Sequence, residues 1–327
     1  MQVLIVNQEQ VRQWLPMHEC IEVMAEVLEM LARGQATNPL RQMLWLPDQT
    51  GLLGMMPAYL DDAEVMGLKA ISVFPGNQET EYDSHQGAVL LFEARHGRLL
   101  AILEASEITA IRTAAVSGVA TRLLAREEAD DLTILGSGVQ AATHLEAMRC
   151  VRKIHRIRVW SRNFAHAQQF AVRESARLHI EVEPMKTAEE AVADATIICT
   201  TTSASDPILK GDWLTPGTHL NAVGACVPFM RELDTAAVAR SRLFVDRRES
   251  ALKEAGDFLI PQKEGVLDTD HIQGEIGQVL HHQVKGRETA EDITLFKSLG
   301  LAVQDVASAH HIYKKMVAKK QGKWVDF

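Results

Sequence analysis

The apolar residues in the first third of the chain change their spacing from helical to strand-like. Residues 7–34 carry apolar side chains at helical intervals, and Gly34 is placed to end that helical stretch. Short apolar runs then predict strands at Gln42–Leu46, Leu68–Phe74, Ala88–Phe92 and Leu99–Leu103. The His96-Gly97 turn joins the last two as a hairpin, and a helix rich in small residues is expected over Ile108–Leu124.

Beyond Asp130, signals for strands and helices alternate. The predicted strands are Leu132–Leu135, Ile157–Ser161, Ala195–Thr200, Thr218–Val223 and Leu243–Asp246. The helices predicted between them are His144–Arg149, Phe164–Arg177 and a short one opened by the capping box Thr187-Ala188-Glu189-Glu190. This alternation indicates a parallel sheet with helices on both faces. The last helical pattern, Leu301–Lys319, is expected to return to the N-terminal domain, because the alternating unit is already complete.

A glycine-rich turn lies between the first strand and the first helix of this alternating region. The segment Gly136-Ser137-Gly138-Val139-Gln140-Ala141 matches the G-x-G-x-x-A fingerprint in the strand-turn-helix context that dinucleotide binding requires. Gly136 permits the tight turn, Gly138 lets the backbone approach a pyrophosphate, and the helix N-terminus offers amide donors. The sequence therefore predicts an α/β fold in which a Rossmann NAD(P)-binding domain, residues 125–300, is inserted in a second domain made of residues 1–124 and 301–327.

The end of the second strand of this domain bears on the choice of nicotinamide cofactor. An NAD enzyme usually places an acidic residue there to bind the ribose 2′-hydroxyl. This chain has Ser161-Arg162-Asn163 instead, with an arginine suited to a 2′-phosphate and no carboxylate. The residues favour NADP(H), and NAD(H) stays open.

Composition excludes several classes of protein. The chain has 327 residues, 46% of them hydrophobic and 24% charged, which is typical of a globular protein of about two domains. A net charge of -9 argues against a nucleic-acid binder, and no apolar run approaches the roughly 18–20 residues that span a bilayer. The four cysteines have neither zinc-ligand spacing nor a disulfide pattern, which points to the cytoplasm.

Several segments, in the same order along nearly the whole chain, resemble the ornithine cyclodeaminase/mu-crystallin family. Besides the fingerprint, the matching segments are Gly67-Leu68-Lys69, Ile111–Ser117, Asn221–Ala225, Ala251–Asp257 and Phe296–Gly300. The resemblance implies an α+β substrate-binding and dimerisation domain around the Rossmann domain, and a homodimer. It also implies further cofactor contacts near the fingerprint, and we assign to the cofactor site Gly136, Gly138, Val139, Gln140, Ser161, Arg162, Asn163, Thr113, Thr200, Thr202, Val223 and Ser298.

Three cations match the family positions that hold the substrate carboxylate. They are Arg41, Lys69 and Arg112. Arginine offers a carboxylate a planar pair of donors. Lys69 lies in an apolar run and Arg112 in a helix of small apolar residues, so both are costly to bury without an anionic partner. For Arg41 and Arg112 the alternatives are a surface strand residue and an internal salt bridge, respectively.

Two further residues qualify the expected chemistry. Members of the family that deaminate carry an aspartate where this chain has Cys226, and a thiol with a reference pKa near 8.5 is a poor substitute for it. His85 is either a proton donor or a structural histidine.

The His281-His282 and His310-His311 pairs lack the additional ligands of a metal site, so no metal is expected.

The resemblance implies an NAD(P)H-dependent reductase of 2-imino acids such as pyrroline-2-carboxylate or piperideine-2-carboxylate. The alternatives within the family are an ornithine cyclodeaminase and an alanine dehydrogenase or iminosuccinate reductase. A non-catalytic NADPH-dependent binding protein is a third possibility, although three cations converging on one anion favour an enzyme. The sequence leaves open which imino acid is the substrate, in which direction the reaction runs, and which group donates the proton.

Overall fold

The computed structural model describes residues 2–327, which divide into two compact units. One unit combines the chain up to Arg112 with Gly300–Phe327, and the other is Thr113–Leu299. The first division falls inside helix α3 (Ala105–Leu124), whereas the sequence-based domain boundary lies at the end of that helix. One continuous helix therefore contributes residues to both units.

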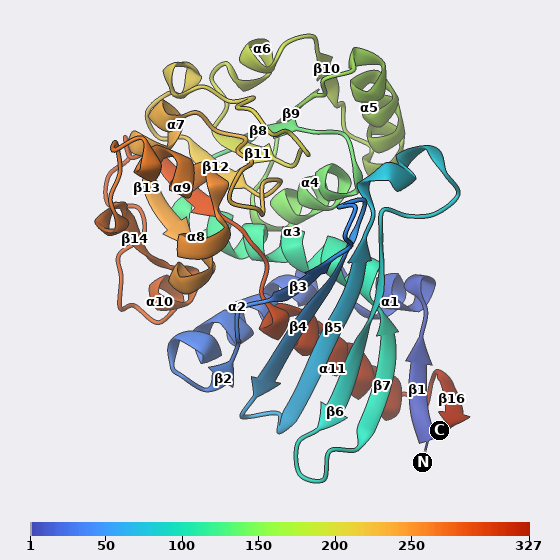
Figure 1. Ribbon diagram of the computed structural model, residues 1–327. Coiled ribbons are helices and arrows are strands. Elements are labelled where there is room, and N and C mark those ends of the chain that lie inside the picture. The colour runs from blue at the N-terminus through green and yellow to red at the C-terminus, as the bar shows by residue number, and fades with distance from the viewer. Residues whose placement is uncertain (1) are drawn as a thin grey trace. The chain divides into compact units, whose positions relative to one another are not determined.

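The first unit is built on a mixed eight-stranded sheet. Its strands are β1 (Gln2–Val6), β2 (Ala36–Thr37), β3 (Gln42–Trp45), β4 (Leu52–Leu60), β5 (Val65–Val73), β6 (His85–Glu93), β7 (Leu99–Glu104) and β16 (Lys323–Asp326). They follow the order β16-β1-β7-β6-β5-β4-β2, with β3 paired to β4. All pairs are antiparallel except β1 with β7. The pairing of β1 with β16 places both ends of the chain at one edge of the sheet (Figure 1).

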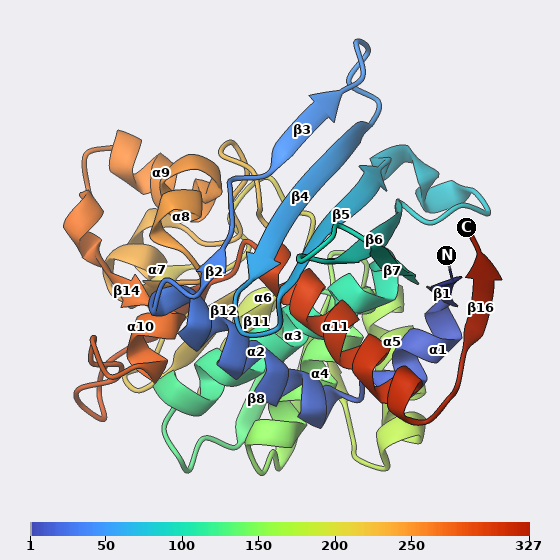
Figure 2. The same cartoon turned by 90° about the horizontal axis from the view of Figure 1, so that it is seen from below.

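Helices cover one face of this sheet. They are α1 (Gln8–Trp14), α2 (Met17–Ala32) and α11 (Ala302–Ala318), and the 3-10 turn η1 (Pro75–Glu79) follows β5. Helix α11 packs on β4, β5 and β6 and also against α2, and it runs behind the strands in Figure 1. A Cβ atom on Gly67 would lie 2.7 Å from Val306 Cγ2, so a glycine is needed where β5 meets α11. Figure 2 shows α11 along the sheet from below.

The opposite face of the same sheet, which we call the open face, is apolar. Pro57, Leu68 and Leu90 are paired across β4, β5 and β6 on this face. Met66, in the next row, has 38% of its surface exposed, and Leu44 on β3 has 60%. Large apolar patches of this kind commonly mark interaction surfaces.

The second unit is a parallel sheet with the order β10-β9-β8-β11-β12-β15-β13-β14. Its strands are β8 (Asp131–Leu135), β9 (Arg156–Trp160), β10 (Glu183–Met185), β11 (Ile197–Thr200), β12 (His219–Ala222), β13 (Arg242–Val245), β14 (Ile272–Glu275) and β15 (Thr294–Lys297). Its helical elements are α4 (Val139–Val151), α5 (Phe164–Leu178), α6 (Ala188–Val192), α7 (Thr235–Ala239), α8 (Arg248–Glu254), α9 (Gly256–Lys263), α10 (Ile276–Leu280), η2 (Gly211–Trp213) and η3 (Thr269–His271). The strand order reverses at β8, as in doubly wound nucleotide-binding sheets. The predicted fold class is confirmed.

Local sequence explains where several of these elements begin. Asn7 caps α1 through a capping box with Gln10, and Thr187 caps α6 through the capping box expected with Glu190. All four residues of β11 are buried, as befits a central strand covered on both faces. Among residues 2–327, no helix combines the length and apolar character needed to cross a membrane.

Candidate active site

The three cations predicted from the sequence come together in the first unit. Lys69 lies in the middle of β5 on the face covered by α11, Arg112 lies on α3, and Arg41 directly precedes β3. Lys69 Nζ is 2.9 Å from Asp305 Oδ2, and Arg112 Nε donates to Asp305 Oδ1 over 2.9 Å. Arg112 Nη1 also donates to Gln304 Oε1 at 2.9 Å. We call Arg41, Lys69, Arg112 and Asp305 the cation cluster.

Burial makes this cluster electrostatically unusual. Lys69 is 2% exposed, Arg112 4% and Asp305 0%. Two buried cations therefore share one buried carboxylate, which leaves a net positive charge away from water. Burial lowers the pKa of Lys69 to about 8, the charge of Asp305 opposes that shift, and Arg112 and Arg41 add to it. A group so displaced from its ordinary value marks a candidate site for an anion.

Gly300 shapes the other side of the cluster. Arg41 Nη2 donates to the carbonyl oxygen of Gly300 at 2.9 Å. Gly300 has a φ of +80°, and a Cβ atom there would lie 2.5 Å from Arg112 Nη1. Only glycine suits both the left-handed backbone and the approach of the guanidinium. The segment that begins α11 thus contacts both arginines.

Asp305 and Gln304 were not identified from the sequence, although a signal for Asp305 was present. In Leu301-Ala302-Val303-Gln304-Asp305-Val306-Ala307, Asp305 is the sole charged residue in an apolar stretch. That feature singled out Lys69, and it applies equally to a carboxylate. Sequence alone could not have paired the two, because 236 positions separate residues 69 and 305.

His85 does not hydrogen-bond to the cation cluster. It begins β6, paired with Val73, four positions along β5 from Lys69. Its Nδ1 lies 3.0 Å from Ser84 Oγ, and Ser106 Oγ donates to its backbone carbonyl. Partial shielding from water lowers the pKa of His85, and the charge of Lys69 lowers it further, although the side chain remains exposed. Its role as proton donor stays a prediction.

The glycine fingerprint lies at the point where the strand order of the second unit reverses. Gly136 follows β8 with a φ of +128°, and a Cβ atom there would lie 2.5 Å from Thr201 Oγ1 beyond β11. Gly138 is the N-cap of α4, and nothing lies within 4 Å of the position a Cβ atom would take. This open cradle at a helix N-terminus fits a pyrophosphate. In the first turn of α4, Val139 is 68% exposed and Gln140 Oε1 is buried without a hydrogen-bond partner in residues 2–327.

The neighbouring strand ends are clamped by a carboxylate. Glu232 accepts from Thr202 N at 2.6 Å, Gly224 N at 2.7 Å, Thr200 Oγ1 at 2.7 Å and Thr202 Oγ1 at 2.8 Å. These donors come from the ends of β11 and β12, where Rossmann sheets bind their ligands. Val223, between β12 and Gly224, therefore lies in a fixed turn.

A second buried carboxylate supports Glu232. Asp257 Oδ1 accepts from the backbone N–H of Glu232 at 2.8 Å, and Asp257 Oδ2 lies 2.9 Å from Lys297 Nζ. Burial raises the pKa of Glu232 above its ordinary value, whereas the charge of Lys297 opposes the shift. Glu232 and Lys297 were not predicted from the sequence as site residues. Ser298 follows Lys297 directly and is 2% exposed.

The remaining predicted cofactor residues are placed as follows. Ser137 Oγ donates to Ser161 Oγ at 3.1 Å, which ties the fingerprint turn to the end of β9. Arg162 is exposed, and Asn163 caps α5 by accepting from Ala165 N at 3.0 Å. Thr113, on α3, is 7% exposed. None of these positions carries a carboxylate.

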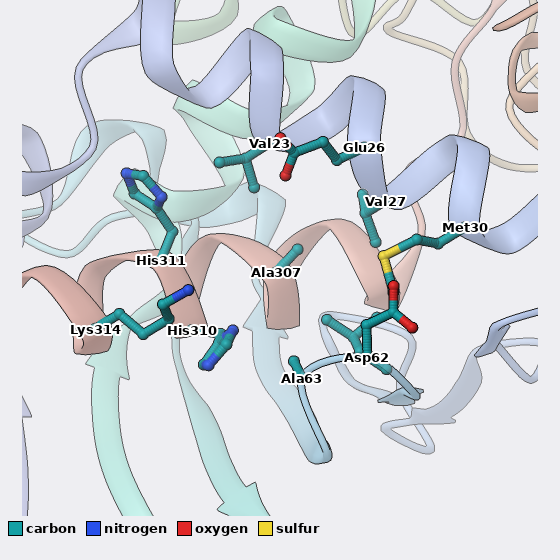
Figure 3. Close-up of a pocket in the computed structure, with 11 residues that line it drawn as sticks. Val23, Glu26, Val27, Met30, Asp62, Ala63, Ala307, His310, His311 and Lys314 are labelled. Carbon is teal, nitrogen blue, oxygen red and sulfur yellow. The ribbon is translucent and has the colours of Figure 1, made fainter.

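Cys226 lies beside the strand ends of the second unit, and the histidine pair of α11 lies outside the cation cluster. Cys226 Sγ donates to the carbonyl oxygen of Val223 at 3.3 Å and packs on the core of the second unit. Figure 3 shows His310 and His311 pointing in different directions beside a cavity of about 450 Å³ between α2 and α11. His311 Nε2 lies 2.8 Å from Glu19 Oε2, and burial lowers the pKa of His310 to about 4. In residues 2–327, no three His, Cys, Asp or Glu side chains are placed to hold a metal ion.

Comparison with known proteins gives a consistent result. The ketimine reductase mu-crystallin of Mus musculus is 39% identical over 282 residues, covering 86% of this chain and 85% of that protein. The solved structure of Thermococcus litoralis Delta(1)-pyrroline-2-carboxylate reductase in complex with NADH and L-proline superposes with a TM-score of 0.95, at 38% identity, covering 98% of this chain and 99% of that one. An archaeal alanine dehydrogenase dimer with bound NAD superposes at 0.94, with 32% identity and complete coverage of both chains.

Residues 1–320 match the ornithine cyclodeaminase/mu-crystallin family. The protein therefore belongs to the ornithine cyclodeaminase/mu-crystallin family.

Proposed function

We propose that this protein is an NAD(P)H-dependent reductase of 2-imino acids, with cyclic ketimines such as pyrroline-2-carboxylate as the preferred class. The observation that carries the proposal is the excess of buried positive charge in the cation cluster. Lys69 and Arg112 are nearly inaccessible to water, and Asp305 balances only one of them. Buried charge is costly unless it is paired, so the cluster is suited to receive one further anion. The carboxylate of an imino acid supplies that anion.

The chain's own residues bind and orient the substrate. A bound nicotinamide supplies the hydride, which the carbon next to the carboxylate accepts. Arg112 and Lys69 donate to the carboxylate and fix that carbon relative to the first unit. A protonated imine is already electrophilic, so no strong acid is required, which fits the presence of Cys226 where deaminating members carry aspartate. Reduction is favoured over deamination for this reason.

NADP(H) is the preferred cofactor in this proposal. Arg162 is exposed at the end of β9, available to a 2′-phosphate, and neither Ser161 nor Asn163 can replace the carboxylate that binds a 2′-hydroxyl. In the same proposal, the first unit binds the substrate and the second unit binds the nucleotide at Gly136, Gly138 and the strand ends held by Glu232.

The active form in this proposal is a homodimer that pairs through the open face. Pro57, Leu68 and Leu90 form a continuous apolar surface there, and a second copy of the same sheet is the simplest complement. Met66→Lys should convert the dimer to a monomer, as measured by light scattering during size-exclusion chromatography. If the Met66→Lys variant remained dimeric, the open face could not be the interface. The four free cysteines, two of them buried, agree with a reducing cytoplasm.

A substrate panel tests the function directly. Pyrroline-2-carboxylate, piperideine-2-carboxylate, iminosuccinate, and pyruvate with ammonia are each offered with NADPH and with NADH, and nicotinamide absorbance is followed. Rapid oxidation with a cyclic ketimine is the expected result. Faster turnover of pyruvate with ammonia would instead make the protein an alanine dehydrogenase. A separate assay with ornithine and NAD should release little ammonia, and substantial release would reject the argument from Cys226.

A further inference from the structure

We propose that Asp305 is a positioning residue that sets the distance between Lys69 and Arg112 and keeps Lys69 charged for the substrate carboxylate. The proposal rests on the proposed function, because it assigns the cation cluster to an imino acid. It adds α11, which follows the nucleotide-binding unit in the chain, to the substrate site.

The geometry gives each oxygen of Asp305 one cation. Oδ2 lies 2.9 Å from Lys69 Nζ, and Oδ1 accepts from Arg112 Nε at 2.9 Å. Because the two oxygens are rigidly joined, they hold the two cations at a fixed separation despite their mutual repulsion. Asp305 is completely buried, so water cannot take over this role.

Gln304 fixes the orientation of Arg112. Its Oε1 accepts from Nη1 at 2.9 Å, and Asp305 occupies Nε. Two consecutive residues of α11 therefore fix the orientation of the guanidinium through Nε and Nη1.

The pKa of Lys69 distinguishes a positioning role of Asp305 from a merely structural one. The groups that face Lys69 are Asp305 from α11, Arg112 from α3, Arg41 from the segment before β3 and His85 from β6. Asp305 alone among them is negative, and it raises the pKa of Lys69 while burial and the two arginines lower it to about 8. Without the carboxylate, Lys69 should lose its proton at a lower pH.

The experiment compares Asp305→Asn and Asp305→Glu with the unmodified protein. Glu19→Gln is the matched control, because Glu19 also contacts two basic side chains of α11, His311 and Lys315, but none of the cation cluster. Lysine labelled with ¹³C at Cε is titrated by NMR, with Lys69→Arg used to assign the signal. In parallel, KM and kcat for the ketimine are measured from pH 6 to pH 9.

In Asp305→Asn, the titration of Lys69 should move at least one unit below its pH in the unmodified protein. At pH 8 about half of Lys69 is charged in the unmodified protein, and a pKa lower by one unit reduces this fraction about fivefold. KM at pH 8 should therefore rise about fivefold, with a smaller rise at pH 6 and little change in kcat. Asp305→Glu should keep the titration near its original pH but still raise KM, because the longer side chain displaces the cations. Glu19→Gln should change neither quantity.

An unchanged Lys69 titration in folded Asp305→Asn would overturn the proposal. If that variant does not fold, Asp305→Glu decides, and an unchanged KM there would equally reject a positioning role. The NMR titration requires no substrate. Failure of the unmodified protein to reduce any imino acid would therefore reject the proposed function while leaving the electrostatic role of Asp305 separately measurable.

Discussion

Replacing Arg112 by methionine is the most direct perturbation of the proposed substrate site. The guanidinium is 4% exposed and contacts Asp305 and Gln304. Its loss leaves Lys69 and Asp305 as a balanced buried pair, so the variant should fold. A substrate carboxylate would then lack one charged partner, which typically costs about 2–5 kcal/mol. At about 1.4 kcal/mol per factor of ten, kcat/KM should fall roughly 30-fold to several thousand-fold.

The assay follows NADPH oxidation with the best ketimine over a range of concentrations and pH values. Arg112 lowers the pKa of Lys69. In Arg112→Met the rise of KM at alkaline pH should therefore begin above pH 8, whereas in Asp305→Asn it should begin at a lower pH. Arg126→Met is the control, because Arg126 lies outside the cation cluster and near Glu128. A loss in kcat/KM below threefold, or an equal loss in the control, would refute the assignment of Arg112 to the carboxylate.

Three further predictions test other parts of the structure. Arg162→Ala should weaken NADPH binding by about 1.5–3 kcal/mol and leave NADH nearly unaffected, as measured by fluorescence titration; equal losses would reject the 2′-phosphate contact. The pKa of Lys69 is about 8 in the folded protein and ordinarily 10.5, so the unfolded state binds more protons between these values. The free energy of unfolding should therefore gain up to about 3 kcal/mol as pH rises from 8 to 10.5, and denaturation of Lys69→Met should show no such gain. Glu232→Gln replaces one acceptor oxygen by an amide group that faces a backbone N–H, so urea denaturation should show a loss of about 1–3 kcal/mol or more, and unchanged stability would contradict the clamp at the strand ends.

The sequence predicted the elements whose apolar periodicity is strong. The helix expected over Phe164–Arg177 is α5, and the strand expected over Ala195–Thr200 contains β11. It missed β4, which forms nine residues of the central antiparallel sheet. Gly54 and Pro57 interrupt its pattern and indicate turns when read locally. Tertiary pairing with β5 on one side and β3 on the other overrides those local signals.

The candidate site shows the same limit. Lys69 and Arg112 could be recognised because each is a charge in an apolar setting. Their shared carboxylate could not be assigned, because no local rule connects β5 and α3 to a helix near the end of the chain. Glu232 was hidden for a related reason: its four hydrogen-bond donors come from two strand ends that only the folded sheet brings together.

The location of α11 has a consequence for synthesis of the protein on the ribosome. The second unit is one continuous stretch, Thr113–Leu299, and all its strands are available before the C-terminal residues are made. The first unit is different, because its sheet lacks the covering helix α11 and the edge strand β16 until the whole second unit has been translated. During this interval the apolar faces of β4, β5 and β6 are exposed, and nascent chains are then most prone to aggregate or to need a chaperone. Folding of the nucleotide-binding unit should precede that of the cation cluster, which acquires Asp305 only after the second unit has been made.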